Sequence, residues 1–224
     1  MGRWPGLINC RLNHFCVKVL IDLQYLPSIA YFTALYGMDE IVLEKHEHFV
    51  KQTYRNRCYI NTVHGSQALI VPLTSRHRGV LTRDVRIDYK QKWLNNHWRT
   101  ITSAYGKAPY FEHYSEDLEH VLFRKYNFLY DLNFNLLTLC LSWLKWGVSV
   151  KETLSYEKEM QEDIYDLRSF ITPKKPDNVK RLYVPVSYYQ VFGNAFADNL
   201  SVIDLMFCNG PEAGRIIQAS SVSG

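Results

Sequence analysis

The sequence predicts an α/β fold, with a central mixed, partly parallel sheet, flanking helices and a helical C-terminal half. Two observations lead to this prediction. Within residues 17–44, a short β-branched run is followed by a helical segment and a second short β run, the order that opens a parallel β-α-β unit. After residue 92 the apolar residues recur every three to four positions, as in helices that pack on a core.

The β-α-β unit comes first along the chain. Residues 17–23 (VKVLIDL) predict a strand that ends at the sequence QYLP, residues 24–27. A proline and a serine then open a helix over residues 28–36, and Gly37 ends it. Residues 40–44 (EIVLE) predict the second strand of the unit.

Two further β features are expected before the helical part. Residues 58–60 and 68–71 flank the sequence His64-Gly65-Ser66, which predicts a β-hairpin. Residues 80–87 alternate in polarity and predict another strand.

The chain beyond residue 92 is predicted to be mainly helical. Trp93, His97, Ile101 and Ala104 recur at the spacing of one helix face. The other elements expected are helices over 116–123 and 127–144, a charged helical segment over 157–170, a loop over 172–178, a strand over 188–192 and a final helix that begins at residues 201–207.

Composition indicates a folded domain and argues against several classes. The 224 residues are 47% hydrophobic, enough for one large domain with a buried core. The net charge of +4 is far from the dense basic stripe of a nucleic-acid-binding protein, so no nucleic-acid partner is expected. The five cysteines are scattered without CxxC spacing, which argues against a disulfide framework or structural zinc and fits a cytoplasmic location. The best-known hydrolase, NTPase, Rossmann and zincin signatures are absent, and no cofactor is expected.

Residues 1–16 are interpreted as a non-native or disordered extension, because their scattered basic residues and short apolar runs resemble neither a signal peptide nor an anchor. Residues 17–224 are then a single domain. The longest apolar stretch, residues 132–144, is interrupted by Asn133 and Asn135 and is too short to cross a bilayer, so no transmembrane segment is expected.

Polar segments follow the first two strands. Gln24 and Tyr25 lie at the carboxyl end of the first strand, where α/β sheets bind ligands beside the free N–H donors of a helix N-terminus; the alternative is a plain turn. After the second strand, Lys51, Arg55 and Arg57 are suited to phosphate or carboxylate, and the alternative is a solvated basic edge.

Histidines and one carboxylate are the other candidates. His46 and His48 would share a strand face, as metal ligands do, but no third ligand has a suitable spacing; a solvated strand end is the alternative, and no metal is expected. His97 lies on the apolar helix face, as a hydrogen-bonded core residue or as a general base. Ser201 and Asp204 lie on one helical turn, as an N-terminal cap or as site residues.

Taken together, four segments resemble the WbqC-like family in order and spacing, over about Val17 to Glu212. These segments are 24–27 with 31–32, 54–57 with Ile60, Trp93-x-x-x-His97 with 104–105 and 108–111, and 200–205 with 209–211. The residues that carry over from this resemblance are Gln24, Tyr25, Asn56, Arg57, His97, Tyr105, Ser201, Asp204 and Asn209. This chain departs from many members over residues 150–181, which are charged here and rich in glycine there.

The resemblance implies a role in O-antigen or other surface-polysaccharide biosynthesis, with glycine transfer suggested for some members. The first hypothesis is therefore a cytoplasmic transferase that moves a glycyl or other acyl group onto a nucleotide- or lipid-linked sugar. In this hypothesis His97 is the general base, Asn56 donates to the developing oxyanion and Asp204 orients a partner. The substrate is held by Gln24, Tyr25, Lys51, Arg55, Arg57, Tyr105, Ser201 and Asn209.

The second hypothesis is a non-catalytic protein. Sixteen tyrosines and five tryptophans offer ring faces for sugars or for partner surfaces, although rings in such numbers also build a core. Such a protein binds sugar nucleotides or contacts other enzymes of the polysaccharide pathway as a scaffold.

Overall fold

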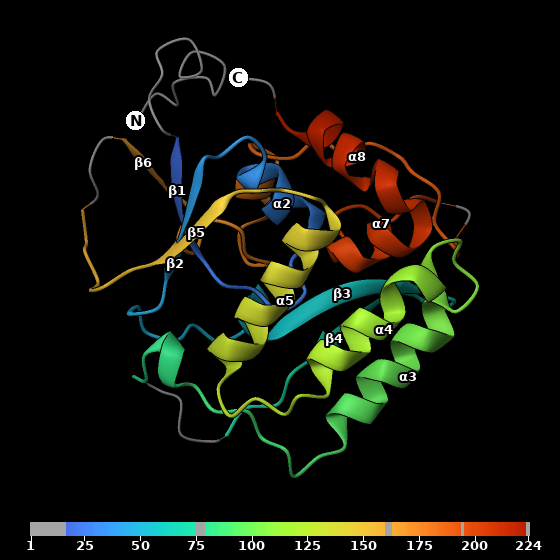
Figure 1. The fold of residues 1–224 in the computed structure, drawn as a ribbon, viewed down its shortest axis with the longest axis horizontal. Helices are drawn as coiled ribbons and strands as arrows, with labels where there is room; N and C mark the ends of the chain where they lie inside the picture. Colours follow the sequence, from blue (N-terminus) through green and yellow to red (C-terminus); the bar gives the residue numbers. More distant parts are fainter. Residues whose placement is uncertain (1–16, 75–78, 160–162, 194, 223–224) are drawn as a thin grey trace.

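A computed structural model describes residues 17–74, 79–159, 163–193 and 195–222, so the predicted extension over residues 1–16 lies outside the described residues. Four strands form a parallel sheet in the order β5-β2-β1-β6 (Figure 1). They are β1 (Lys18–Asp22), β2 (Glu40–Glu44), β5 (Ser149–Glu152) and β6 (Ile164–Asp166). The carboxyl ends of all four strands therefore lie along one edge of the sheet.

The predicted β-α-β unit is confirmed. The helix α2 (Ile29–Leu35) connects β1 to its parallel neighbour β2, and all seven of its residues are buried. Gly37 follows it with a φ of 77°, a conformation that glycine adopts without steric cost. The interior of β1 is an unbroken apolar run because parallel strands are covered on both faces.

The predicted hairpin is also confirmed. The strands β3 (Arg57–Thr62) and β4 (Gly65–Ile70) pair antiparallel across residues 63–64, and Gly65, directly after the turn, has a φ of 91°, which glycine adopts without steric cost. The hairpin is a sheet of its own, separate from the parallel one. The α/β class with mixed strand directions is thus correct, and the two directions occur in two sheets.

Six helices lie after residue 92 in the described part of the chain. They are α3 (Trp93–Tyr105), α4 (Phe111–Leu122), α5 (Leu129–Trp143), α6 (Pro176–Val179), α7 (Val202–Asn209) and α8 (Ala213–Ser220), with 3-10 turns η2 (Tyr54–Asn56), η3 (Thr82–Asp84) and η4 (Gly210–Glu212). Central among them is α7, which contacts α2, α3, α4 and β3 and so joins the parallel sheet to the hairpin half (Figure 1). Within the described ranges, none of these helices has the length and apolar character that crossing a bilayer requires.

Several predicted elements are wrong. Residues 80–87 contain η3 and single β-bridges instead of a strand, and residues 188–192 have no regular structure. The described part of the segment 157–170 contains the strand β6 and no helix. The strand β5 was not predicted, and the loop over 172–178 contains the start of α6. Both β5 and β6 are sheet edges of three or four residues, too short for a hydrophobic period to show.

Candidate functional site

The four segments that carry the family resemblance meet in space. The Tyr25 N–H donates to Tyr54 O at 2.9 Å, and the Ser201 N–H donates to Tyr59 O at 2.8 Å. The Tyr25 hydroxyl lies 3.0 Å from His97 Nδ1, which joins the segment after β1 to α3. We call this region the joint, because it ties the end of β1 to the hairpin, to α3 and to α7.

The N-terminus of α2 is closed by the segment before α7. The Ile29 N–H donates to Leu200 O at 2.9 Å, and the Ala30 N–H donates to Asn199 Oδ1 at 3.0 Å. The Ser201 hydroxyl donates to Leu26 O at 2.8 Å from the other side. The expectation that this helix offers free N–H donors to an anion is therefore wrong, because these donors already have partners within the chain.

His97 is held inside the joint. Its side chain is 6% exposed, and the Trp93 ring lies edge-on with its centroid 5.1 Å away. Burial lowers the His97 pKa to about 4, so the imidazole is neutral at pH 7. This environment is that of a hydrogen-bonded core histidine, and a role as general base stays a prediction.

Asp204 on α7 is fully buried and accepts three hydrogen bonds. The Tyr105 hydroxyl donates to Oδ1 at 2.7 Å, while the Tyr188 hydroxyl and Gln190 Nε2 donate to Oδ2 at 2.7 and 3.1 Å. Burial raises the Asp204 pKa, and the hydrogen bonds from Tyr188, Tyr105 and Gln190 oppose that rise. The carboxylate anchors residues 188–190 to α7 and α3.

Arg55 is fully buried at the carboxyl edge of the parallel sheet. Its Nε donates to Glu47 Oε1 at 3.1 Å, its Nη2 lies 3.6 Å from Asp22 Oδ2, and the same Nη2 donates to Ser169 Oγ at 3.0 Å. The guanidinium N–H groups therefore already have partners within the chain. A phosphate at this position would have to displace Glu47 or Asp22.

The other predicted site residues bond within the chain or lie nearer to its surface. Gln24 Nε2 donates to Ile171 O and Asn56 Nδ2 donates to Val71 O, both inside the protein. Asn209 Nδ2 donates to Tyr189 O, Lys51 is exposed, and Arg57 is half-buried. Their proposed roles in binding or catalysis stay predictions.

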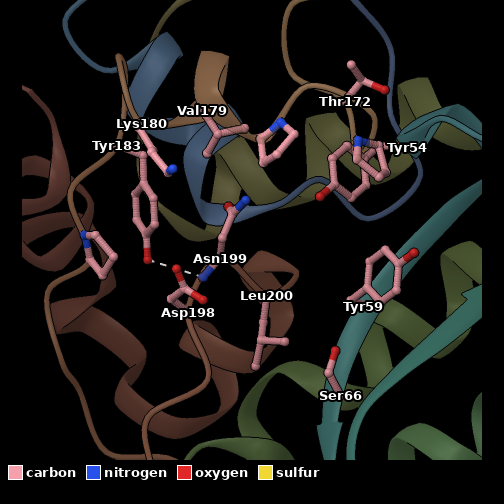
Figure 2. A pocket seen from close by; sticks show the side chains of 13 residues that line it. Tyr54, Tyr59, Ser66, Thr172, Val179, Lys180, Tyr183, Asp198, Asn199 and Leu200 are labelled. Atoms are coloured by element: carbon pink, nitrogen blue, oxygen red, sulfur yellow. Dashed lines mark hydrogen bonds between the residues drawn. The ribbon is translucent and has the colours of Figure 1, made fainter.

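An open cavity of about 590 Å³ lies directly beside the joint (Figure 2). None of the eleven predicted site residues lines it, although Tyr54, Tyr59 and Leu200 each neighbour the joint in sequence or through a hydrogen bond. The described residues that form its wall are Tyr54, Tyr59, Ser66, Thr172, Pro173, Pro176, Val179, Lys180, Tyr183, Pro185, Asp198, Asn199 and Leu200.

Two groups of side chains face each other across this cavity. Figure 2 shows Tyr54 and Tyr59 on one side and Tyr183, Asp198 and Asn199 on the other. The rings of Tyr54 and Tyr59 meet edge to face with centroids 6.1 Å apart. Strand alternation explains why Tyr59 on β3 and Ser66 on β4 share this face of the hairpin, since Ser66 pairs with Asn61, two residues from Tyr59.

Asp198 gives the cavity its negative charge. Its side chain is exposed and makes no hydrogen bond or ion pair with any other residue that the structure describes. Burial raises the pKa of Tyr54 to about 12, with the neighbouring Tyr59 and Asp198 adding to the rise. Burial and Asp198 likewise raise the pKa of Tyr183 to about 12, opposed by its hydrogen bond with the Asn199 backbone. Both hydroxyls are thus protonated at neutral pH and can donate to a ligand.

The sequence was compared with known protein families and with individual proteins. The sequence model of the WbqC-like protein family matches residues 24–175, more than half of the chain. The chain belongs to the WbqC-like protein family. The predicted membership is therefore confirmed. The uncharacterized protein Rv1507c of Mycobacterium tuberculosis is 25% identical to this WbqC-like protein over 220 residues, covering 87% of this chain and 94% of that protein. No solved structure matches the chain.

The cavity of this WbqC-like protein straddles the end of the family match. Five lining residues lie inside residues 24–175, and the other eight lie between Pro176 and Leu200. The cavity was not predicted from the sequence because most of its wall lies beyond the family match, in a segment without a recognisable motif. The signal within reach was Tyr54, which belongs to one of the four segments that carry the family resemblance.

Proposed function

We propose that this WbqC-like protein binds a sugar-bearing small molecule in the cavity beside the joint. The pair of rings from Tyr54 and Tyr59 is the observation that carries the proposal. A sugar ring has an apolar C–H face that packs on an aromatic ring and hydroxyls around its edge that need hydrogen-bond partners. A volume of about 590 Å³ lies in the range of small-molecule sites.

The polar groups of the cavity fit the hydroxyl edge of such a ligand. The Tyr54 and Tyr59 hydroxyls donate, and the Asp198 carboxylate accepts from the ligand's hydroxyl or amino groups. Lys180 adds a cation at the rim, where it also pairs with Asp177 at 2.8 Å. These groups are few within a wall that also holds three prolines and Val179, as expected for a site that fixes the orientation of a largely apolar ligand face.

The cellular context is the one that the family resemblance implies. It supports a ligand from surface-polysaccharide biosynthesis, O-antigen assembly included, such as a nucleotide-linked sugar in the cytoplasm. Contact with other enzymes of that pathway stays a prediction.

Calorimetric titration with UDP-glucose, and with glucose and UDP alone, tests the proposal. We expect saturable binding of the sugar nucleotide, at least about tenfold weaker in Tyr59→Ala because the stacked ring is lost. Tyr59→Phe, which keeps the ring and removes the hydroxyl, should lie between the two. Tyr189→Ala is the matched control, since Tyr189 is 58% exposed and does not line the cavity. Equal losses in Tyr59→Ala and Tyr189→Ala would contradict the proposal.

A transferase is the second candidate, and the unpaired carboxylate of Asp198 in the cavity favours it. In acyl transfer, the acceptor's amino or hydroxyl group attacks the acyl carbonyl, the bond to the leaving group breaks with its electron pair, and a base takes the acceptor's proton. Asp198 faces the cavity and could take that proton, whereas His97, the base predicted from the sequence, lies within the joint.

Turnover assays separate the two candidates. Mass spectrometry of a sugar-linked acceptor incubated with an acyl donor reports the product, and Asp198→Asn and His97→Gln report the base. Loss of product by about a hundredfold or more in one variant, with binding kept, identifies a catalytic base. Binding without product in the unmodified protein favours the non-catalytic function.

A further inference from the structure

A second cavity, of about 450 Å³, lies on the other face of the β3–β4 hairpin. Its wall contains Thr62 and Gln67, whereas the first cavity is lined by Tyr59 and Ser66 of the same two strands. Successive side chains of a strand point to opposite faces, so the two cavities lie back to back across the hairpin. The second cavity is closed on its other side by α3, through Arg99 and Ser103.

The side chains of this second cavity carry a surplus of hydrogen-bond donors. Arg99, His64, Gln67 and Ser103 all line it, and none of their side chains has a hydrogen bond or an ion pair within the described residues. Four donors from two separate elements are therefore available to one ligand.

The remaining lining residues do not compete for these donors. The Thr62 hydroxyl already donates to Gly65 O at 2.8 Å, and the Thr100 hydroxyl donates to Asn96 O at 2.8 Å. None of the described residues of the wall is an aspartate or a glutamate, in contrast to the first cavity with its Asp198. The charge of the second cavity is thus positive, set by Arg99.

We infer that this second cavity binds the phosphoryl group of a small molecule, through the Arg99 guanidinium with His64, Gln67 and Ser103. A carboxylate offers only two oxygens in one plane, whereas a phosphoryl group presents three terminal oxygens and can accept from donors on both the hairpin and α3. The volume exceeds that of phosphate alone, and Phe192 is the aromatic residue among those that line the cavity, available to the rest of the molecule. The inference is independent of the sugar site, because the two cavities share no lining residue.

Titration with inorganic phosphate and with phenyl phosphate, followed by NMR of the His64 imidazole at constant ionic strength, tests the inference. We expect saturable shifts of the His64 resonances when the anion is bound, since the imidazole is one of the donors that line the cavity. Phenyl phosphate should bind more tightly than inorganic phosphate because its ring can pack on Phe192. Acetate at the same ionic strength should bind at least several-fold more weakly than phosphate.

Matched variants decide whether phosphate binds in the second cavity. Arg99→Gln keeps an exposed, helix-favouring side chain and should weaken phosphate binding at least about tenfold. Arg124→Gln is the control, because Arg124 is also exposed and its guanidinium has no partner in the described part of the chain. Four results would overturn the inference. Phosphate binding could be unchanged in Arg99→Gln, could fall equally in both variants, could be matched by acetate, or could fail to saturate. Unchanged phosphate binding in Tyr59→Ala is expected whether or not the sugar site is correct.

Discussion

At the scale of single residues, the carboxyl edge of the parallel sheet is a network of charges that is buried at β1 and β2. The last residue of each parallel strand is acidic: Asp22, Glu44, Glu152 and Asp166. Arg55 pairs with Asp22 and Glu47, and Arg168 Nη1 lies 3.1 Å from Glu44 Oε2. Burial raises the pKa of Glu47 to about 7 even though Arg55 opposes the rise. The two arginines therefore offset the free-energy cost of burying Asp22, Glu44 and Glu47 near the strand ends.

Removing Arg55 should destabilise the protein strongly. Arg55→Met keeps much of the side-chain volume but leaves Asp22 and Glu47 buried without their cation, at a cost of about 3–5 kcal/mol in the free energy of unfolding. Urea unfolding at neutral pH measures this cost. Arg124→Met, at an exposed arginine, should change the free energy by less than about 0.5 kcal/mol. A loss below about 1 kcal/mol in Arg55→Met would contradict the role of Arg55 in the network.

His97 should make the fold sensitive to acid. Burial lowers its pKa to about 4 in the folded protein, below the ordinary histidine value of 6.5, so the unfolded chain takes up the proton first. The free energy of unfolding should therefore fall as the pH drops from about 6.5 to about 4, by up to roughly 3 kcal/mol from this residue.

His97→Gln, which replaces the titrating ring with a neutral polar side chain, should remove that part of the slope. Urea unfolding at several pH values between about 4 and 7 measures it for both proteins. Glu47 acts in the opposite direction, because its raised pKa lowers stability as the pH rises from about 4.5 to about 7, so the comparison with His97→Gln is needed to isolate the histidine. The same slope in both proteins would show that His97 titrates normally.

The identities of the polar residues in the joint were foreseeable, and their roles were not. The sequence marked Tyr25, His97 and Asp204 as notable and left open whether His97 is a core residue or a base. Their hydrogen bonds join positions 72 and 99 residues apart, which no local spacing reports. The same spacing is compatible with a buried partner or with a substrate.

At the scale of elements, the backbone takes uncommon conformations at three helix ends: before α2, before α7 and after α7. Leu26 and Asn199 have φ values of 42° and 49°, and hydrogen bonds between residues 26–30 and 199–202 hold them in place. At the end of α7, Gly210 has a φ of 51°, and a β-carbon there would lie 2.5 Å from Tyr110 Cδ1. The chain thus passes close to α4 only because residue 210 has no side chain.

Gly210→Ala should therefore destabilise the protein by about 2–3 kcal/mol, through both the backbone strain and the contact with the Tyr110 ring. Gly214→Ala provides the matched control: Gly214 lies in α8 with nothing within 4 Å of its β-carbon position, and alanine there should stabilise by up to about 1 kcal/mol. Thermal unfolding measures both. Equal effects of the two substitutions would show that Gly210 is not constrained.

Elements were predictable where a pattern was long or flanked by turn residues. Residues 17–44 and the face Trp93, His97, Ile101, Ala104 gave the β-α-β unit and α3 with nearly the observed bounds. The helix α4 begins at Phe111, five positions earlier than predicted. The strands β5 and β6 escaped because edge strands this short are fixed by pairing with β2 and β1, a long-range event.

At the scale of the whole molecule, the cavity forms between the hairpin and the segment that follows the parallel sheet. One wall belongs to η2 and the hairpin, and the other to residues 172–200, which have little regular structure apart from α6 (Figure 2). The joint holds these walls at a fixed separation, since Tyr25 and Ser201 donate to the backbone of Tyr54 and Tyr59 themselves. The family motifs thus position the cavity, while most of its wall lies beyond them.

Chemical-shift mapping of the intact protein with UDP-glucose tests most directly whether the ligand binds in the cavity and not at the family motifs. Saturable shifts centred on Tyr54, Tyr59, Tyr183 and Asp198, with smaller ones at Tyr25 and His97 and none at Arg124, are the result that we predict. Shifts centred on His97 and Asp204 with the cavity residues unmoved would contradict it, as would the absence of any saturable shift at the cavity with a range of sugar nucleotides.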